Sequence, residues 1–237
     1  MGNSIKPHIE TAQKTGACQL SKMGISEFPP ELKRLTKNLR TLDLSENKLA
    51  ELPNDIGSFT MLKNMSLNSN RLAAIPETIG QLKKLESLSL NSNRLLSLPQ
   101  SFNQLNNLRS ITVNNNFLKE FPAQLGGLKN LDSLDLSHNK ITVVPDGVKH
   151  LNVVEINLNE NQVSTLSEAI AECPRLKVLR VEENCLELSA FTPRILKNSQ
   201  ISLLAIEGNL FEQKSFHNLD GYEQYMDRYT ATKKKFA

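Results

Sequence analysis

Large aliphatic residues recur along this chain in one frame, and an asparagine closes each copy of the frame. Apolar residues stand eight, five and three positions before the asparagine, and usually another stands two positions after it. In the first regular copy, Leu39, Leu42, Leu44 and Leu49 surround Asn47. A repeat of this kind is typical of a solenoid, in which neighbouring copies cover one another. The asparagines are separated by 23, 23, 23, 23, 22, 23 and 25 residues: Asn47, Asn70, Asn93, Asn116, Asn139, Asn161, Asn184 and Asn209.

The alternation within each copy predicts a short strand with one buried face. Leu42, Asp43 and Leu44 alternate apolar and polar side chains with a period of two. Stacked copies would pair as a parallel sheet with a spacing of about 4.8 Å. We therefore expect an α/β solenoid, a curved horseshoe with a parallel β-sheet on its concave face.

The ladder asparagines are expected to be structural. A side-chain amide can both donate to and accept from the backbone of adjacent turns, whose polar groups would otherwise be buried without partners. We predict a hydrogen-bonded ladder that follows the solenoid.

A series of prolines predicts how the chain returns on the convex side. Each proline follows an apolar residue, and another apolar residue comes three positions later: Pro53, Pro76, Pro99, Pro122 and Pro145. Proline fixes its own backbone angle and favours an extended residue before it. Short 3₁₀ or helical turns are therefore expected there. In a later copy Ser167 and Glu168 replace this proline pattern, which predicts the loss of the regular turn.

Three segments are expected along the chain. Residues 1–15 are predicted to be flexible, residues 16–214 to hold a degenerate first repeat plus eight asparagine-bearing repeats, and residues 215–237 to form a helical cap with a basic tail. Apolar residues at three- and four-residue spacing favour an amphipathic capping helix: Phe216, Leu219, Tyr222, Met226 and Tyr229. A tyrosine-based regulatory or docking site is the alternative for this last segment.

The unit L-x-x-L-x-L-x-x-N-x-L, with leucine and proline on the return turn, resembles intracellular leucine-rich repeats of the Ras-associated scaffold type over residues 17–211. The resemblance implies a non-enzymatic scaffold or adaptor that binds a protein partner on its concave face, and a monomer is expected. A soluble regulatory subunit that binds a small GTPase or a phosphatase is the alternative.

Composition and scattered polar residues argue against several other functions. The formal charge of +3 is mild, and no basic stripe with interleaved aromatic residues predicts nucleic-acid binding. No catalytic or cofactor motif is present, and the four histidines lie in different parts of the chain, so no enzyme and no cofactor is expected. The cysteines Cys18, Cys173 and Cys185 are not at metal spacing; they favour a reducing compartment and no metal site.

The amino terminus carries a second signal. Met1, Gly2 and Asn3 resemble the start of N-myristoylated proteins, although Lys6 stands where the consensus has serine or threonine. An unmodified start with glycine at position two by chance is the alternative. Because no apolar stretch has the length of a signal peptide or a membrane span, we expect a cytoplasmic protein held reversibly at membranes by a lipid anchor.

The residues six, four, two and one positions before each asparagine are expected to face outward from the concave sheet. Small polar residues fill these positions in the middle copies, whereas carboxylates accumulate toward the carboxyl end. This face suits a basic partner, and a merely hydrated surface is the alternative. The predicted partner-binding residues are Glu155, Asn157, Glu160, Arg180, Glu182, Glu183, Glu207 and His138.

Overall fold

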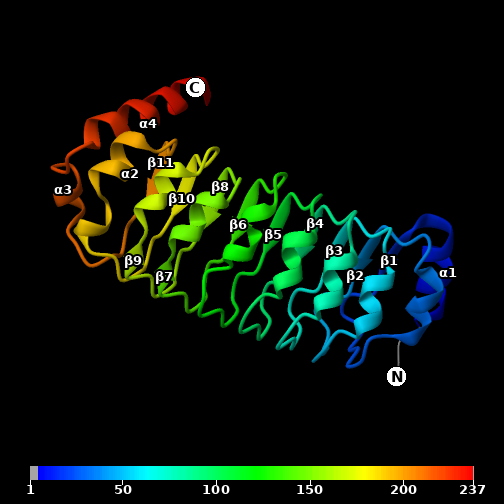
Figure 1. The fold of residues 1–237 in the computed structure, drawn as a ribbon. Helices are drawn as coiled ribbons and strands as arrows, with labels where there is room; N and C mark the ends of the chain where they lie inside the picture. Colours follow the sequence, from blue (N-terminus) through cyan, green and yellow to red (C-terminus); the bar gives the residue numbers. More distant parts are fainter. Residues whose placement is uncertain (1–4, 237) are drawn as a thin grey trace. The chain divides into compact units, whose positions relative to one another are not determined.

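The computed structural model describes residues 5–236, so the predicted lipidation site Gly2 lies outside the described residues. Two compact units make up the chain, unit 1 over Met1–Phe117 and unit 2 over Leu118–Ala237. Each unit is a solenoid of parallel strands and short helical turns, as the sequence predicts (Figure 1).

Within residues 5–117, five parallel strands form the sheet of unit 1. They are β1 (Ala17–Gln19), β2 (Thr41–Asp43), β3 (Asn64–Ser66), β4 (Ser87–Ser89) and β5 (Ser110–Thr112), in chain order. The register advances by one whole repeat at each step, so that Leu42 is opposite Met65 and Met65 is opposite Leu88. Equivalent side chains are therefore stacked, and the central residue of each strand is buried in the core.

Within residues 118–236, the main sheet of unit 2 contains β6 (Ser133–Asp135), β8 (Glu155–Asn157), β10 (Val178–Arg180) and β11 (Leu203–Ala205). A second, two-stranded sheet pairs β7 (Val143–Val144) with β9 (Thr165–Leu166) in parallel. This small sheet was not expected from the sequence, because its strands are only two residues long and carry no alternation.

Short 3₁₀ helices return the chain from one strand to the next, which confirms the turns predicted from the prolines. Unit 1 has η1 (Pro30–Leu35), η2 (Asn54–Ser58), η3 (Glu77–Gln81) and η4 (Gln100–Gln104); unit 2 has η5 (Ala123–Gly127), η6 (Asp146–His150), η7 (Glu168–Glu172) and η8 (Leu188–Ala190). The predicted loss of the turn at Ser167 was wrong. The Ser167 hydroxyl accepts a hydrogen bond from the backbone N–H of Ala169 (3.1 Å) and so caps η7 in place of a proline.

The turns of unit 1 pack so closely that glycine is required between them. A Cβ atom on Gly80 in η3 would lie 2.7 Å from the backbone oxygen of Ser101 in η4. A Cβ atom on Gly57 in η2 would lie 2.6 Å from the backbone oxygen of Thr78 in η3. These separations are shorter than any van der Waals contact, so neighbouring turns approach as they do because these residues lack a side chain.

Residues 1–15 were predicted to be flexible, and this is wrong for the described part, which forms helix α1 (Lys6–Thr15). Pro7 stands in its first turn, and Gly16 ends it in the left-handed conformation (φ 75°) with its N–H donated to the oxygen of Ala12 (2.8 Å). Ile9 and Ala12 are buried against the first repeat. The helix therefore covers the open end of unit 1.

The carboxyl-terminal cap is built from α2 (Pro193–Asn198), α3 (Gln213–Phe216) and α4 (Tyr222–Phe236). The single amphipathic helix predicted from Phe216 onward is interrupted between α3 and α4, where Gly221 adopts φ 97°. The hydroxyl of Tyr225 accepts the backbone N–H of Leu204 on the last strand (3.1 Å), and burial raises the pKa of this tyrosine. Tyr225 thus satisfies a strand-edge donor, which gives it a structural role.

Candidate protein-binding surface

Each ladder asparagine closes the turn that follows its strand. The Nδ2 of Asn93 donates to the oxygens of Leu67 (2.9 Å) and Leu90 (3.1 Å), and its Oδ1 accepts from the N–H of Leu72 (3.1 Å). The other ladder asparagines make the same kind of bonds. From Asn47 to Asn184 they are 5–8% exposed. Their amides are occupied by the backbone of the solenoid and are not offered to a partner.

The residue directly before each ladder asparagine was expected on the concave strands, and this is wrong. These residues lie after the strands in the left-handed conformation, with φ between 51° and 56°: Glu46, Ser69, Ser92, Asn115, His138, Glu160 and Glu183. The backbone must leave the sheet there so that the asparagine can reach into the turn. Their side chains are consequently carried at the rim of the sheet.

A second amide ladder lies two positions before the first and was missed from the sequence. In unit 1 the Oδ1 of Asn68 accepts from the N–H of Asn91 (2.8 Å), and the Oδ1 of Asn91 accepts from Asn114 (3.1 Å). In unit 2, Asn159 accepts in the same way from Glu182 (2.9 Å). The recurrence of asparagine at this position was the signal available in the sequence.

On the sheet of unit 2 and the rim that follows its strands, the structure brings six predicted or neighbouring side chains together as three pairs. The Nε of Arg180 on β10 donates to the carboxylate of Glu155 on β8 (2.8 Å). The Nδ1 of His138 lies 2.9 Å from a carboxylate oxygen of Glu160. The Nδ2 of Asn159 donates to the carboxylate of Glu182 (2.5 Å). All three contacts join adjacent repeats of the same unit.

The remaining predicted residues are less constrained. Asn157 accepts the N–H of Asn159 through its side-chain oxygen (3.0 Å) and so shapes the end of β8. The carboxylate of Glu183 lies over Gly208, since a Cβ atom there would be 2.4 Å from its Oε1. Glu207 is exposed beside it. Within residues 5–236 no ion pair is formed by Glu182, Glu183 or Glu207. This surface therefore holds five predicted carboxylates, with Asp135 of β6 as a sixth, against the single guanidinium of Arg180.

The described part of the chain offers little to support catalysis or a metal. No group of three or more histidine, cysteine, aspartate or glutamate side chains in residues 5–236 could hold a metal ion. Burial raises the pKa of the Cys18 thiol to about 11, and burial, with the Glu172 carboxylate as a lesser cause, raises that of Cys173 to about 12, so both thiols stay protonated. In the same residues, no helix combines the length and the apolar character that crossing a bilayer demands.

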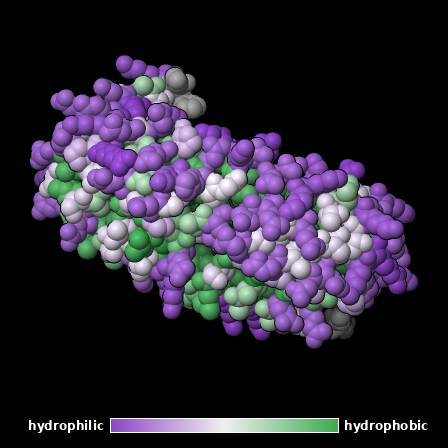
Figure 2. All heavy atoms as spheres, viewed as in Figure 1, coloured by the Kyte–Doolittle hydropathy of each residue, from purple (hydrophilic) through white to green (hydrophobic). Residues whose placement is uncertain are grey.

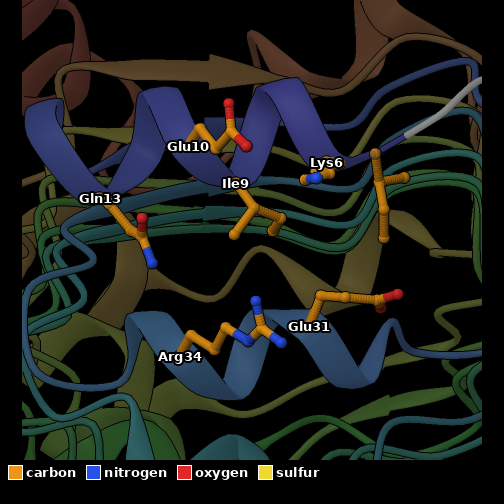
Figure 3. Close-up of a pocket in the computed structure, with 7 residues that line it drawn as sticks. Lys6, Ile9, Glu10, Gln13, Glu31 and Arg34 are labelled. Carbon is orange, nitrogen blue, oxygen red and sulfur yellow. The ribbon is translucent and has the colours of Figure 1, made fainter.

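A groove of about 540 Å³ lies in unit 1 between α1 and η1 (Figure 3). Ile5 and Ile9 are its apolar residues, and polar or charged side chains make up the rest of the lining: Lys6, Glu10, Gln13, Glu31 and Arg34. Figure 3 shows Lys6 at the end where Glu31 lies and Gln13 at the end where Arg34 lies. Such a lining does not suit a long acyl chain, which gains free energy only on an apolar surface.

Models of the leucine-rich repeat match three stretches of the sequence. A leucine-rich repeat region model matches residues 54–138, and two leucine-rich repeat models match residues 129–186 and 38–59. The chain is a leucine-rich repeat protein. This fold is typically non-enzymatic and commonly mediates protein–protein interaction through its exposed strands.

Solved structures of other leucine-rich repeat proteins are similar to this chain. Internalin C2 (inlC2) of Listeria monocytogenes is 18% identical with a TM-score of 0.71, over 85% of this chain and 92% of that one. An internalin (inlF) from the same organism is 21% identical with a TM-score of 0.66, over 86% and 64%. Identities this low show the fold alone.

The ectodomain of the Arabidopsis thaliana receptor kinase GASSHO1/SCHENGEN3, solved in complex with CASPARIAN STRIP INTEGRITY FACTOR 2, is 27% identical with a TM-score of 0.68, over 81% of this chain and 24% of that one. This chain thus spans less than two thirds of the length of that ectodomain and of the internalin inlF.

Proposed function

We propose that the protein is an interaction scaffold that binds a basic protein partner on the sheet face of unit 2 and the rim that follows its strands, and that it is attached reversibly to membranes through N-myristoylation of Gly2. The excess of carboxylates over cations on that face supports the first part. Glu182 and Glu183 lie in one repeat and Glu207 in the next, and none of the three has a cationic partner among the described residues. Complementary charge would select such a partner and speed its association.

The binding proposal is tested by charge reversal at the two least constrained carboxylates. A photo-crosslinking residue at position 207 identifies the partner in cells, and binding of that purified partner is then measured by calorimetry. Glu183→Lys with Glu207→Lys should weaken binding by about tenfold or more, because juxtaposed like charges cost several kcal/mol. The matched control is Glu168→Lys with Glu187→Lys, which changes the charge of unit 2 equally outside the sheet face. Equal affinity of both variants would refute the proposal.

The Met-Gly-Asn-Ser start supports the lipid anchor. The start, residues 10–16 and 175–188, and the final Tyr-Thr-Ala-Thr-Lys-Lys-Lys-Phe-Ala segment also resemble leucine-rich repeat-containing protein 57. That resemblance implies a small lipid-anchored adaptor. The polar lining of the groove beside α1 leaves an acyl chain without a binding pocket there, so it would remain available to a bilayer.

Intact-mass measurement decides whether Gly2 is acylated. Protein co-expressed with an N-myristoyltransferase should gain the mass of one myristoyl group, and Gly2→Ala protein should not. An unchanged mass in the wild type would remove the anchor and favour the soluble regulatory subunit, which binds a small GTPase or a phosphatase.

A further inference from the structure

The segments that follow the ladder asparagines form one edge of unit 1, and this loop edge carries a row of cations. Lys48, Arg71 and Arg94 each directly follow a ladder asparagine and so hold equivalent positions in three consecutive repeats. Their backbone N–H groups donate to carbonyls of the preceding repeat at 2.7 to 2.9 Å, which keeps them in register. All three side chains belong to exposed residues. We call them the basic row.

The basic row is not neutralised by the protein. Among the described residues none of its three members forms an ion pair, whereas Lys33 and Lys63 of the same unit pair with carboxylates at 2.5 and 2.8 Å. Repeats stack about every 4.8 Å, so the three charges lie within roughly one Debye length, about 10 Å at 0.1 M salt. Their mutual repulsion opposes folding slightly, and an extended anionic surface would relieve it.

Acidic residues are sparse along the row. Of the residues within three positions of its members, only Glu46 and Glu51 are acidic, and both flank Lys48. Glu46 is already paired with Lys22 (3.2 Å). Within three positions of Arg71 and Arg94 the sequence has only asparagine, serine, alanine and leucine residues.

Exposed apolar side chains accompany the cations at one end of the row. Leu96 is 59% exposed two residues after Arg94, and Phe117, 41% exposed, takes the row position of the next repeat. Figure 2 shows hydrophilic residues over most of the visible surface and hydrophobic residues at several places along its lower margin, where loops of the repeats lie in Figure 1. Cations beside solvent-exposed leucine and phenylalanine suit the boundary between lipid headgroups and acyl chains.

Helix α1 begins at the same edge. Lys6 and Glu31 lie at one end of the groove in Figure 3, so the first turn of α1 is beside the start of η1. The chain reaches η1 directly from the loop edge of the first repeat. The described part of the chain therefore starts beside the loop edge.

We propose that the basic row, with Leu96 and Phe117, is a membrane-binding surface that docks on anionic lipid headgroups. Its cellular role rests on the proposed lipid anchor, because one acyl chain holds a protein only marginally and a second element is needed. The headgroup contact itself does not require acylation. Each cation that reaches the lipid surface strengthens binding by about fivefold.

The test is sedimentation with phospholipid vesicles, using acylated and unacylated full-length protein. Both forms should bind vesicles of phosphatidylserine in phosphatidylcholine better than phosphatidylcholine alone, and added salt should remove the difference. Reversal of the basic row by Lys48→Glu, Arg71→Glu and Arg94→Glu should lower binding to the anionic vesicles by about tenfold or more. The matched control is Lys37→Glu, Lys84→Glu and Arg109→Glu, which makes the same charge change before the strands.

A fluorescence reporter separates lipid contact from a general charge effect. The chain contains no tryptophan, so Leu96→Trp introduces a single one at the proposed surface. Its emission should shift to shorter wavelength on anionic vesicles and be quenched by brominated acyl chains. The control Lys37→Trp should show neither change.

The membrane-binding surface and the lipid anchor can fail independently of each other. Equal vesicle binding by the row and control variants would overturn the membrane surface, even if Gly2 is acylated. Failure of acylation would remove the anchor, while unacylated protein would still test the row. Binding of a polyglutamate peptide is measured on the same variants. If the row variant loses binding to polyglutamate but keeps binding to anionic vesicles, the membrane surface is overturned and the basic row is assigned to an acidic protein segment.

Discussion

Asn93 lies within the ladder of unit 1, and its amide makes bonds to both the preceding repeat and its own. Asn93→Ala should lower the free energy of unfolding by about 1–3 kcal/mol, since the backbone groups of Leu67, Leu72 and Leu90 would lose buried partners. Urea unfolding measures the change. Asn103→Ala, on the exposed surface of η4, is the control and should be nearly neutral. Equal stability of the two variants would contradict a structural ladder.

Burial divides the three cysteines by reactivity. Cys185 is exposed, whereas Cys18 and Cys173 are buried. A thiol reagent should therefore modify one thiol per folded chain and all three in denaturant. If Cys18 or Cys173 reacted as fast as Cys185, the core around that cysteine would have to open readily by local unfolding.

The same burial predicts how stability changes in alkali. The folded pKa of Cys18 is raised from 9.0 to about 11, so its contribution to stability is complete below pH 9.0 and is lost as the pH rises toward 11. Cys18→Ala should flatten this decline in a series of unfolding curves.

At the residue scale, the frame around each asparagine was enough to separate buried leucines from exposed positions. Local conformation was harder to predict. Glu46, Ser92 and His138 differ in side chain but share the left-handed conformation, because the turn geometry imposes it on whichever residue precedes the asparagine. The asparagine at position 91 looked like a surface residue, although its side chain binds the next repeat.

Among the elements, the 3₁₀ turns of unit 1 are limited by backbone approach. Gly80→Ala should destabilise the protein by about 1–3 kcal/mol, because the added Cβ would lie 2.7 Å from the Ser101 oxygen. Gly127→Ala is the matched control, since a Cβ there meets no atom within 4 Å. Thermal unfolding of both variants measures the difference. A Gly80→Ala protein as stable as the control would mean that η3 and η4 separate without cost.

Elements at the ends of the repeats were the least predictable from the sequence. Helix α1 buries only Ile9 and Ala12 of its ten residues, so the helical period is weak and the segment looked flexible. Pro7 and Gly16 were nevertheless start and stop signals for a helix. The turn at Ser167 survives because a serine cap can replace proline, which a pattern based on proline alone does not recognise.

For the whole molecule, the two proposed surfaces belong to different units and share no side chain. Reversal of the basic row should therefore leave binding of the protein partner unchanged, and Glu183→Lys with Glu207→Lys should leave binding to anionic vesicles unchanged. In the combined variant the two losses should add within about 0.5 kcal/mol, as expected for independent sites. Calorimetry measures partner binding and sedimentation measures vesicle binding, each for the wild type, the two single-surface variants and the combined variant.

A departure from additivity would show that partner binding and vesicle binding influence each other. If vesicles strengthened partner binding, the partner would have to contact the lipid or the basic row itself, because linkage is reciprocal. A partner whose basic residues also reach the anionic headgroups would bind more tightly on vesicles than in solution, and this favourable coupling would fade with salt. Additivity at low salt is therefore the stringent result, since it requires a partner that is held on the carboxylates of unit 2 without reaching the membrane.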